Sequence, residues 1–505
     1  AMARYYLGLD NGGSKVKASL YTPDGREVAV AGVSAVPVIR RGGFVERNSD
    51  RLWELNAQVI REVIAKSGVD PHDIAGVAVS GHGNGAYMIG EDGRPSAPGI
   101  VSTDTRAADV VRRWIKDGVQ ARILPKTMQM LYAGQPVAIL AWYLEHQPDV
   151  IKRTRWVLQC KDYIRYRLTG EVYGEITDMS AISAMDLQTR EYDDKILSEF
   201  GLKAYKYLFP PLKMSTDICG HVTREAAQQT GLVEGTLVSG GLFDCVSCCL
   251  AAGVTDEGTL SVIAGTWSIN SFVSRVPVWS EDLFLTSLFC REGYYLTTEG
   301  SMTSAGNLEW FINSFLTDDE GRRRDNVYEY CNSLVGSLKP QDVGIIFLPF
   351  LYGTNVNPDA KACFMGIDGS QSKAHMVRSM YEGVVFSTKM HIERLLRFTD
   401  VPQKARISGG AAESPLWVQM FADVLQMPIE VSDARELGTL GAAMTAAVAA
   451  GDVPDLVAAA ERMTRVRYRC EPDAANADIY QRKYGIYKDL IKALDPVWAE
   501  WRTLQ

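Results

Sequence analysis

Two short glycine turns, about half a chain apart, contain the residues best suited to hold phosphate. The first is Asp10-Asn11-Gly12-Gly13-Ser14-Lys15 and the second is Gly265-Thr266; each lies between two apolar, strand-like runs. A hairpin tip that exposes backbone N–H groups and a hydroxyl can bind phosphate. Two such tips, one in each half, predict a duplicated fold that holds a polyphosphate and hence a nucleotide-using phosphotransferase.

Asp10 ends the first strand-like run, directly before the first turn. A carboxylate in this place could hold Mg²⁺ through water, beside the phosphates that Gly12, Gly13 and Ser14 contact. Lys15 or Lys17 could neutralise the charge of the transferred phosphoryl group. The alternative is an ordinary surface hairpin turn, which is common. The matched turn at Gly265-Thr266 favours the phosphate interpretation.

Asp244 ends the run Val238-Ser239-Gly240-Gly241-Leu242-Phe243, an apolar strand interrupted by two glycines. A carboxylate among apolar neighbours is costly unless it is hydrated or used. As a general base, Asp244 would take the proton from a substrate hydroxyl while that oxygen attacks a γ-phosphorus. Asp244 could also cap the helix that starts at Cys245, and the two roles are compatible. Cys245, Cys248 and Cys249 lack a second ligand pair nearby, which favours small buried side chains over a zinc site.

Polar residues after two further segments predict a sugar site. Gly81-His82-Gly83-Asn84-Gly85 follows a buried strand but has the spacing G-x-G-x-G, which disfavours a dinucleotide fingerprint. His82 and Asn84 can instead hydrogen-bond a polyol, with Gly83 allowing close approach. Asp104 and Arg106 offer a second polar cluster for the same substrate, or alternatively a cap for a helix over residues 107–115.

A third glycine-rich segment, Ser408-Gly409-Gly410-Ala411-Ala412-Glu413-Ser414, lies between a strand and a helix. Backbone N–H groups at a helix start suit a phosphate or the ribose of adenosine, which makes Gly409, Gly410, Ala411 and Ser414 candidates for nucleotide binding. A tight turn without a ligand is the alternative. The chain has no P-loop sequence of the form G-x-x-x-x-G-K-[ST].

The elements that must position these residues repeat a pattern. Strands are predicted over 4–10, 15–21 and 26–33, then an amphipathic helix from Ser49 and a buried strand over 74–80. The second half repeats this order loosely, with strands over 259–263, 268–273, 293–298, 344–347 and 405–407 and helices from 307 and over 375–398. A helical tail is predicted from Val453 to Gln505. With 505 residues, the chain predicts two α/β domains with a cleft between them.

Composition narrows the class of protein further. A net charge of −8 argues against a nucleic-acid or anionic-membrane partner, because either requires a basic surface. No window has the eighteen or more apolar residues of a membrane helix, and nine cysteines in mostly apolar runs fit reduced thiols. These features predict a cytoplasmic enzyme.

Together these motifs resemble the FGGY family of carbohydrate kinases over nearly the whole chain. The resemblance also rests on Lys161-Asp162-Tyr163-Ile164-Arg165, Tyr381-Glu382-Gly383-Val384 and Glu436-Leu437-Gly438-Thr439. It implies an α/β fold of two ribonuclease H-like (actin/hexokinase/Hsp70-like ATPase) domains around a central cleft, which we assign to residues 2–246 and 247–505. It further implies ATP and Mg²⁺ as cofactors, Asp244 as catalytic base, Asp10 as the metal-linked acid, Gly265 and Thr266 as the second phosphate loop, and Gly409–Ala411 as the adenosine loop. Homodimers are usual in the family, which leaves a homodimer open.

Within the family, residues 80–85 and 102–106 most resemble the L-xylulose kinase branch, which implies a ketopentose or a related keto-sugar acid as substrate. L-Ribulose, D-xylulose and erythritol are alternatives. The segment 135–142 lacks a lysine that is common in the family, and Trp267 replaces the usual serine of the second loop. These departures motivate one further alternative, a sugar- or ATP-binding sensor of the same fold without catalysis.

Overall fold

The computed structural model describes residues 4–36 and 38–504, so residue 2, where the first predicted domain begins, lies outside it. The chain forms two compact units, each assembled from separate segments. The first unit contains the chain up to residue 256, residues 273–297 and residues 436–465; the second contains residues 257–272, 298–435 and the chain from 466. The units are discontinuous in sequence, whereas the predicted domains meet at one boundary after residue 246; that division stays a prediction.

The first unit is built on a sheet with the order β14-β15-β6-β1-β2-β3, in which β16 also pairs with β6. Its strands are β1 (Tyr5–Asn11), β2 (Lys15–Tyr21), β3 (Glu27–Ser34), β6 (Ile74–Gly81), β14 (Ile218–His221), β15 (Leu237–Ser239) and β16 (Leu242–Phe243). β1 pairs antiparallel with β2 as far as Asn11↔Val16, and parallel with β6. The predicted antiparallel strands around the first glycine turn are therefore confirmed.

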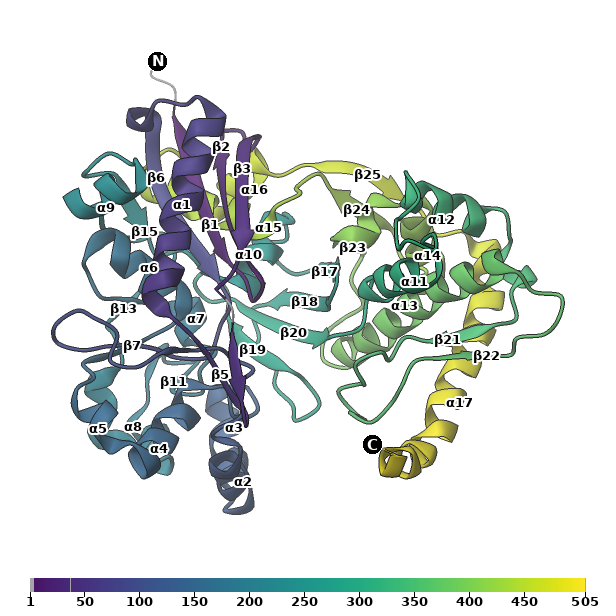
Figure 1. Cartoon of the computed structure of the whole chain (residues 1–505), viewed down its shortest axis with the longest axis horizontal. Helices are drawn as coiled ribbons and strands as arrows, with labels where there is room; N and C mark the ends of the chain where they lie inside the picture. The colour runs from purple at the N-terminus through teal and green to yellow at the C-terminus, as the bar shows by residue number, and fades with distance from the viewer. Residues whose placement is uncertain (1–3, 37, 505) are drawn as a thin grey trace. The chain divides into compact units, whose positions relative to one another are not determined.

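Helices cover both faces of this sheet (Figure 1). Helix α1 (Ser49–Ser67) begins after Asn48, whose side chain accepts a hydrogen bond from the Arg51 N–H, and its apolar stripe packs on Leu7 and Leu9 of β1. The intervening residues of β1 point to the other face, because side chains alternate along a strand. There Gly8 meets α15 (Leu437–Ala449) so closely that a Cβ would overlap with the Thr439 carbonyl group.

The rest of the first unit consists of helices and short strands, some of which surround a second apolar core. The helices are α2 (Ala108–Lys116), α3 (Val119–Thr127), α4 (Pro136–His146), α5 (Pro148–Lys152), α6 (Cys160–Thr169), α7 (Ile176–Met179), α8 (Asp194–Glu199), α9 (Arg224–Thr230), α10 (Asp244–Ala251) and α16 (Leu456–Met463). The short strands are β4 (Ile39–Arg41), β5 (Phe44–Arg47), β7 (Tyr87–Ile89), β8 (Gly99–Ile100), β9 (Trp156–Leu158), β10 (Gly174–Glu175), β11 (Met185–Asp186), β12 (Glu191–Tyr192), β13 (Leu212–Lys213) and β19 (Leu285–Leu288).

The second unit contains a sheet in which β18, β17, β23, β24 and β25 are neighbours in that order. The strands assigned to it wholly or in large part are β17 (Thr259–Ala264), β18 (Ser268–Ser274), β20 (Tyr295–Ser301), β21 (Ile346–Leu348), β22 (Cys363–Met365), β23 (Lys404–Ser408), β24 (Ile429–Ser432) and β25 (Val466–Cys470). Its helices are α11 (Gly306–Phe315), α12 (Val327–Gly336), α13 (Lys373–Leu396), α14 (Pro415–Leu425) and α17 (Ala477–Trp501). β17 and β18 form the predicted second hairpin, with Ala264 opposite Ser268.

The prediction of a continuous helical tail from Val453 to Gln505 was wrong. Residues 466–470 form β25, which pairs antiparallel with β24 and separates α16 from α17. The alternation Val466-Arg467-Tyr468-Arg469-Cys470 suits a strand with one covered face, because period-two patterning and β-branched or aromatic residues favour strands. Among the described residues, no helix combines the length and the hydropathy needed to cross a membrane.

Candidate active site

Asp10 lies at the end of β1, on the sheet face that α15 covers. A Cβ at Gly438, in the first turn of α15, would overlap with the Asp10 carboxylate, so only glycine allows this approach. The Asp10 Oδ1 atom is buried and accepts no hydrogen bond from the residues that the structure describes. A buried acceptor without a partner is costly, which suggests that an absent group completes this site.

Asp244 is the first residue of α10, and Phe243 occupies the N-cap position without a side-chain cap. Helix α10 packs closely on α15: the Ser247 hydroxyl donates to the Gly438 carbonyl at 2.8 Å, and a Cβ at Gly441 would overlap with Ser247. The end of β1 and the starts of α10 and α15 therefore meet, which brings the Asp10 and Asp244 side chains near each other.

The two carboxyl groups hold protons more tightly than isolated aspartates do. Burial, the nearby Asp244 charge and Glu436 raise the pKa of Asp10 to about 7, although Lys17 opposes this. Burial raises the pKa of Asp244 to about 6, although hydrogen bonds from Cys245 favour the ionised form and lower this pKa. A pair of acids with pKa values near neutrality is typical of groups that exchange protons or bind a cation.

The first glycine turn is closed by a hydrogen bond from the Gly12 N–H to the Lys15 carbonyl, at 3.0 Å. Gly13, Ser14 and Lys15 are exposed, and a Cβ at Gly13 would meet no atom within 4 Å. The Lys17 Nζ atom pairs with Glu436 Oε2 at 2.9 Å, so this lysine already has an anionic partner. The Gly13 carbonyl accepts a hydrogen bond from Arg47 Nη2 at 3.1 Å, which holds the turn near Asp10. Lys15 is the lysine that faces solvent.

The predicted sugar residues His82, Gly83 and Asn84 follow β6 directly. His82 is nearly buried, and its Nε2 atom lies 3.0 Å from the Tyr87 hydroxyl. Burial and the Arg47 charge lower the pKa of His82 to about 4, so the ring is neutral near pH 7. The Asn84 Oδ1 atom is buried without a hydrogen bond among the described residues, and a Cβ at Gly83 would lie 2.5 Å from the Phe243 ring. These three residues therefore lie beside the segment that carries Asp244.

Asp104 and Arg106 bond mainly to each other and to β5. Arg106 Nε lies 2.9 Å from Asp104 Oδ1, and its Nη2 atom contacts Glu46 at 2.7 Å and Asp104 at 2.8 Å. The Val45 N–H donates to Asp104 Oδ2 at 2.7 Å. Helix α2 starts at Ala108 without a side-chain cap, so this pair serves to anchor β5 rather than to cap α2. Its contact with a sugar stays a prediction.

In the second unit, the predicted nucleotide residues Gly265, Thr266, Gly410 and Ser414 line one cavity of about 660 Å³. The hydroxyl of Ser414 donates to Asn332 Oδ1 at 2.8 Å, and so does that of Tyr381. The Tyr381 ring stacks on Trp417 with centroids 4.1 Å apart. A flat aromatic wall, a polar amide and two glycines without side chains, Gly265 and Gly410, in a cavity of this size suit a nucleotide.

The two remaining candidate residues of the third glycine segment, Gly409 and Ala411, do not line this cavity. Gly409 has φ +95°, and a Cβ there would lie 2.7 Å from the Gly265 backbone nitrogen. Ala411 is fully buried in the 3₁₀ turn Gly410–Glu413. They shape the backbone that presents Gly410.

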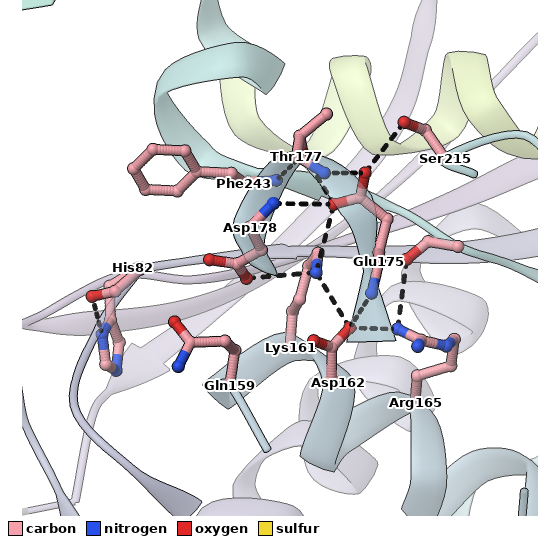
Figure 2. Close-up of polar contacts among 12 residues, drawn as sticks. His82, Gln159, Lys161, Asp162, Arg165, Glu175, Thr177, Asp178, Ser215 and Phe243 are labelled. Atoms are coloured by element: carbon pink, nitrogen blue, oxygen red, sulfur yellow. Dashed lines mark hydrogen bonds and ion pairs between the residues drawn. The ribbon is translucent and has the colours of Figure 1, made fainter. Parts of the chain in front are cut away.

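Several residues of these sites were missed by the sequence reasoning. In the second unit these are the aromatic and amide side chains of the cavity, Tyr328, Asn332, Tyr381 and Trp417. In the first unit they are Glu175, Thr177 and Asp178, which Figure 2 shows together with Phe243, whose N–H donates to the Thr177 hydroxyl. Their only signal in the sequence was two acids, Glu175 and Asp178, close to a threonine in an apolar stretch.

The donor set around Asp10 fits Mg²⁺. Among residues 4–36 and 38–504, no three or more His, Cys, Asp or Glu side chains gather into a site that could hold a metal ion. Mg²⁺ usually keeps several waters and is held by one or two carboxylates together with substrate phosphates. The unpartnered Oδ1 of Asp10, beside the open turn at Gly12 and Gly13, matches this pattern.

Comparison with known proteins identifies the class of protein that this fold and site define. The model of the N-terminal domain of the FGGY family of carbohydrate kinases matches residues 5–251, and that of the C-terminal domain matches residues 260–450. The chain therefore belongs to the FGGY family of carbohydrate kinases, as its motifs predicted, and it is a sugar kinase. Kinases of this family use ATP and a divalent metal ion.

Individual relatives match over almost the whole chain. The L-xylulose/3-keto-L-gulonate kinase of Escherichia coli is 36% identical over 98% of this chain and 98% of its own. A probable L-xylulose kinase of Pasteurella multocida is 37% identical over 97% of this chain and 99% of its own. The xylulose kinase of Rhodospirillum rubrum has a similar structure, with a TM-score of 0.87 and 25% identity over 98% of this chain and 100% of that one. The predicted fold class, two domains of the actin/hexokinase type, is thereby confirmed.

Proposed function

We propose that this kinase transfers the γ-phosphate of ATP to a hydroxyl group of a ketopentose or of a related keto-sugar acid. The observation that carries the proposal is the pair of carboxyl groups at Asp10 and Asp244, whose pKa values burial raises to about 7 and about 6. One group with a proton affinity near neutrality can serve as a base, while the other can hold a metal ion.

In this proposal, Asp244 accepts the proton of the substrate hydroxyl as its oxygen attacks the γ-phosphorus. Asp10 would hold Mg²⁺ through water, and the ion, when bound, would neutralise charge on the phosphates. Gly12, Gly13 and Ser14 would contact phosphate, with Lys15 as an exposed positive charge. Gly265, Thr266, Gly410 and Ser414 line a cavity of a size that suits the nucleotide.

The sugar would bind beside His82, Gly83 and Asn84. A neutral His82, held by the Tyr87 hydroxyl, and the free Oδ1 of Asn84 can exchange hydrogen bonds with sugar hydroxyls. L-Xylulose is the first candidate, because two of the relatives are named for it. 3-Keto-L-gulonate is the second, since one of those names includes it.

The test is ADP release from Mg-ATP with a panel of L-xylulose, 3-keto-L-gulonate, D-xylulose, L-ribulose and erythritol. We expect the highest kcat/KM with L-xylulose or 3-keto-L-gulonate. A higher kcat/KM with L-ribulose or D-xylulose would overturn the choice of L-xylulose among the ketopentoses, and a higher kcat/KM with erythritol would overturn the ketopentose assignment itself. Binding of ATP without release of ADP on any of these sugars would favour a non-catalytic sensor.

A further inference from the structure

A fully buried ionic cluster lies behind the sugar-binding residues of the first unit. We call Lys161, Asp162, Arg165, Glu175 and Asp178 the Lys161 cluster; each is at most 1% exposed. The Lys161 Nζ atom lies 2.9 Å from Asp162, 3.3 Å from Glu175 and 3.1 Å from Asp178, and Arg165 lies 2.6 Å from Asp162 (Figure 2). These carboxylates raise the pKa of Lys161 although burial opposes them, so Lys161 stays charged.

Burying five ionisable groups is expensive, and replacing such clusters by apolar residues is often neutral or stabilising. Stability alone therefore does not explain the Lys161 cluster. What it does provide is a connected set of donors and acceptors, because Lys161 and Asp162 each bond to more than one of the other members. Arg165 bonds directly to the segment that leads to Asp244, and Glu175 bonds to the same segment through the side chain of Thr177.

The first link runs through Thr177. Its hydroxyl donates to Glu175 Oε1 at 2.6 Å and accepts the backbone N–H of Phe243 at 3.1 Å. Because the single hydroxyl hydrogen points at Glu175, a lone pair of the oxygen is left for Phe243, and the direction of both bonds is fixed. Phe243 directly precedes Asp244 and is the N-cap residue of α10.

The second link runs through Arg165, whose Nη1 atom donates to the Gly240 carbonyl at 3.2 Å. Gly241, the next residue, has φ +76°, and a Cβ there would overlap with the Val79 carbonyl. The segment Gly240–Phe243 is therefore held at both ends by the Lys161 cluster. Together with the pairing of β16 with β6 and the contact between α10 and α15, these bonds hold the backbone that leads to Asp244.

We propose that Thr177 is a positioning residue for Asp244: it fixes the Phe243 backbone, with its own orientation set by Glu175 and Lys161. The inference rests on the proposed role of Asp244 as the base. Thr177 contacts neither carboxylate of the proposed reaction, so it acts through the backbone alone. A displacement of about 1 Å can lower a catalysed rate about a hundredfold.

The test compares Thr177→Val with Thr177→Ser, using Mg-ATP and L-xylulose. Valine has nearly the same shape but neither donates nor accepts, so we expect kcat to fall about tenfold to a hundredfold with the KM for ATP unchanged. Serine keeps the hydroxyl, and its kcat should lie within about threefold of the wild-type value. Ser215→Ala is the matched control, because Ser215 also donates to Glu175, at 3.0 Å, but its hydroxyl does not contact Phe243. Equal losses in Thr177→Val and Ser215→Ala would overturn the proposal.

A double mutant separates positioning from a general loss of structure. If Thr177 acts through Asp244, adding Thr177→Val to Asp244→Asn should cause almost no further loss in kcat. If the fold-decreases in kcat of the two single variants instead multiply in the double mutant, the two residues act independently, and the inference is contradicted. An Asp244→Asn enzyme that keeps wild-type kcat would instead count against the proposed base.

Amide hydrogen exchange gives a readout that does not depend on catalysis. Loss of its acceptor should speed exchange at the Phe243 N–H about tenfold or more in Thr177→Val, and leave it unchanged in Ser215→Ala. Unchanged exchange in Thr177→Val would overturn the proposal. A wild-type enzyme without turnover on any sugar would count against the proposed function, whereas the exchange measurement would still decide whether Thr177 holds Phe243.

Discussion

Asp10 and Asp244 have similar chemistry but different surroundings, and the difference assigns their proposed roles. Asp10 has a buried oxygen that accepts no hydrogen bond from the described residues, and it lies beside the exposed turn at Gly13, which suits a metal ion and phosphate. Asp244 starts a helix beside His82 and Asn84, where a sugar hydroxyl would lie. The proposed base and the proposed metal-holding acid are therefore distinguished by their neighbours rather than by their residue type.

Replacing Asp244 by asparagine tests this role directly. We expect kcat to fall about 10²–10⁴-fold, the range usual for a lost general base, while the affinity for ATP stays the same. Steady-state kinetics and titration with a non-hydrolysable ATP analogue would measure both quantities. A folded Asp244→Asn enzyme with near-wild-type kcat would exclude Asp244 as the base.

The same variant should not unfold more readily than the wild type at pH 8. The pKa of Asp244 is raised to about 6, so the native state binds this proton more tightly than the unfolded state does. As the pH rises from about 4 to about 6, this difference lowers the free energy of unfolding. At pH 8 the native state carries the whole cost of the buried charge, and a neutral asparagine removes that cost. Thermal unfolding at pH 8 should give a melting temperature at or above that of the wild type; a clearly lower one would contradict this.

The pH dependence of the reaction follows from the same pKa. The base acts only when ionised, so log kcat/KM should fall with a slope of about one per pH unit below an apparent pKa of about 6. Because Asp10 interacts with Asp244, the measured value belongs to the pair. Initial rates between pH 5 and 8 at saturating Mg-ATP would check this. If the Asp244→Asn enzyme still shows the fall of log kcat/KM at low pH, the observed pKa belongs to another group.

At the scale of elements, the contact between β1, α10 and α15 holds the site together. Gly438 permits α15 to reach Asp10, and Gly441 permits it to reach α10. Helices that approach this closely need glycine at the contact, because any side chain would separate them.

Gly438→Ala should therefore disturb both the site and the fold. The added methyl group would overlap with the Asp10 carboxylate, and overpacking of this kind costs about 1–3 kcal/mol of stability. Gly485→Ala is the matched control: it lies within α17, no atom is within 4 Å of its Cβ position, and it should stabilise by up to about 1 kcal/mol. Denaturant unfolding and kcat of both variants measure the difference. Equal stability of the two would show that α15 can shift away.

Elements made of local patterns were predictable, and contacts between distant segments were not. The strands around Gly12 and the stripe Leu52, Leu55, Val59, Ile60 and Val63 of α1 are visible in sequence because their periods are two and 3.6. Asp10, Asp244 and the glycines were identified as candidates by residue type and by resemblance. Their convergence depends on Ser247 bonding to Gly438, 191 residues away, and no local pattern encodes such a pairing. Thr177 was missed for the same reason, since Phe243 lies 66 residues further on.

At the scale of the whole molecule, each compact unit depends on segments that are far apart in the chain. The first unit needs residues 436–465, because α15 covers the faces of β1 and β6 that α1 leaves open. The second unit likewise combines residues 257–272, residues 298–435 and the chain from 466. A boundary drawn once through the sequence would separate elements that share a core.

A fragment of residues 2–256 should consequently lack a stable fold. Without α15, the apolar side of β1 and β6 is exposed, and we expect no cooperative thermal unfolding by circular dichroism. The matched control joins residues 273–297 and 436–465 to this fragment through glycine–serine linkers, which should restore a cooperative transition. Cooperative unfolding of the shorter fragment alone would show that α15 is dispensable for the first unit.

The late position of α15 also bears on synthesis at the ribosome. Asp10 is synthesised long before Gly438 and its helix, which complete the surroundings of Asp10. Chains grow from the N-terminus, so one face of the first sheet stays uncovered until α15 has been translated. A stalled nascent chain that ends before residue 436 would be inactive and exposed to chaperones, even though it contains all of the proposed sugar-binding residues.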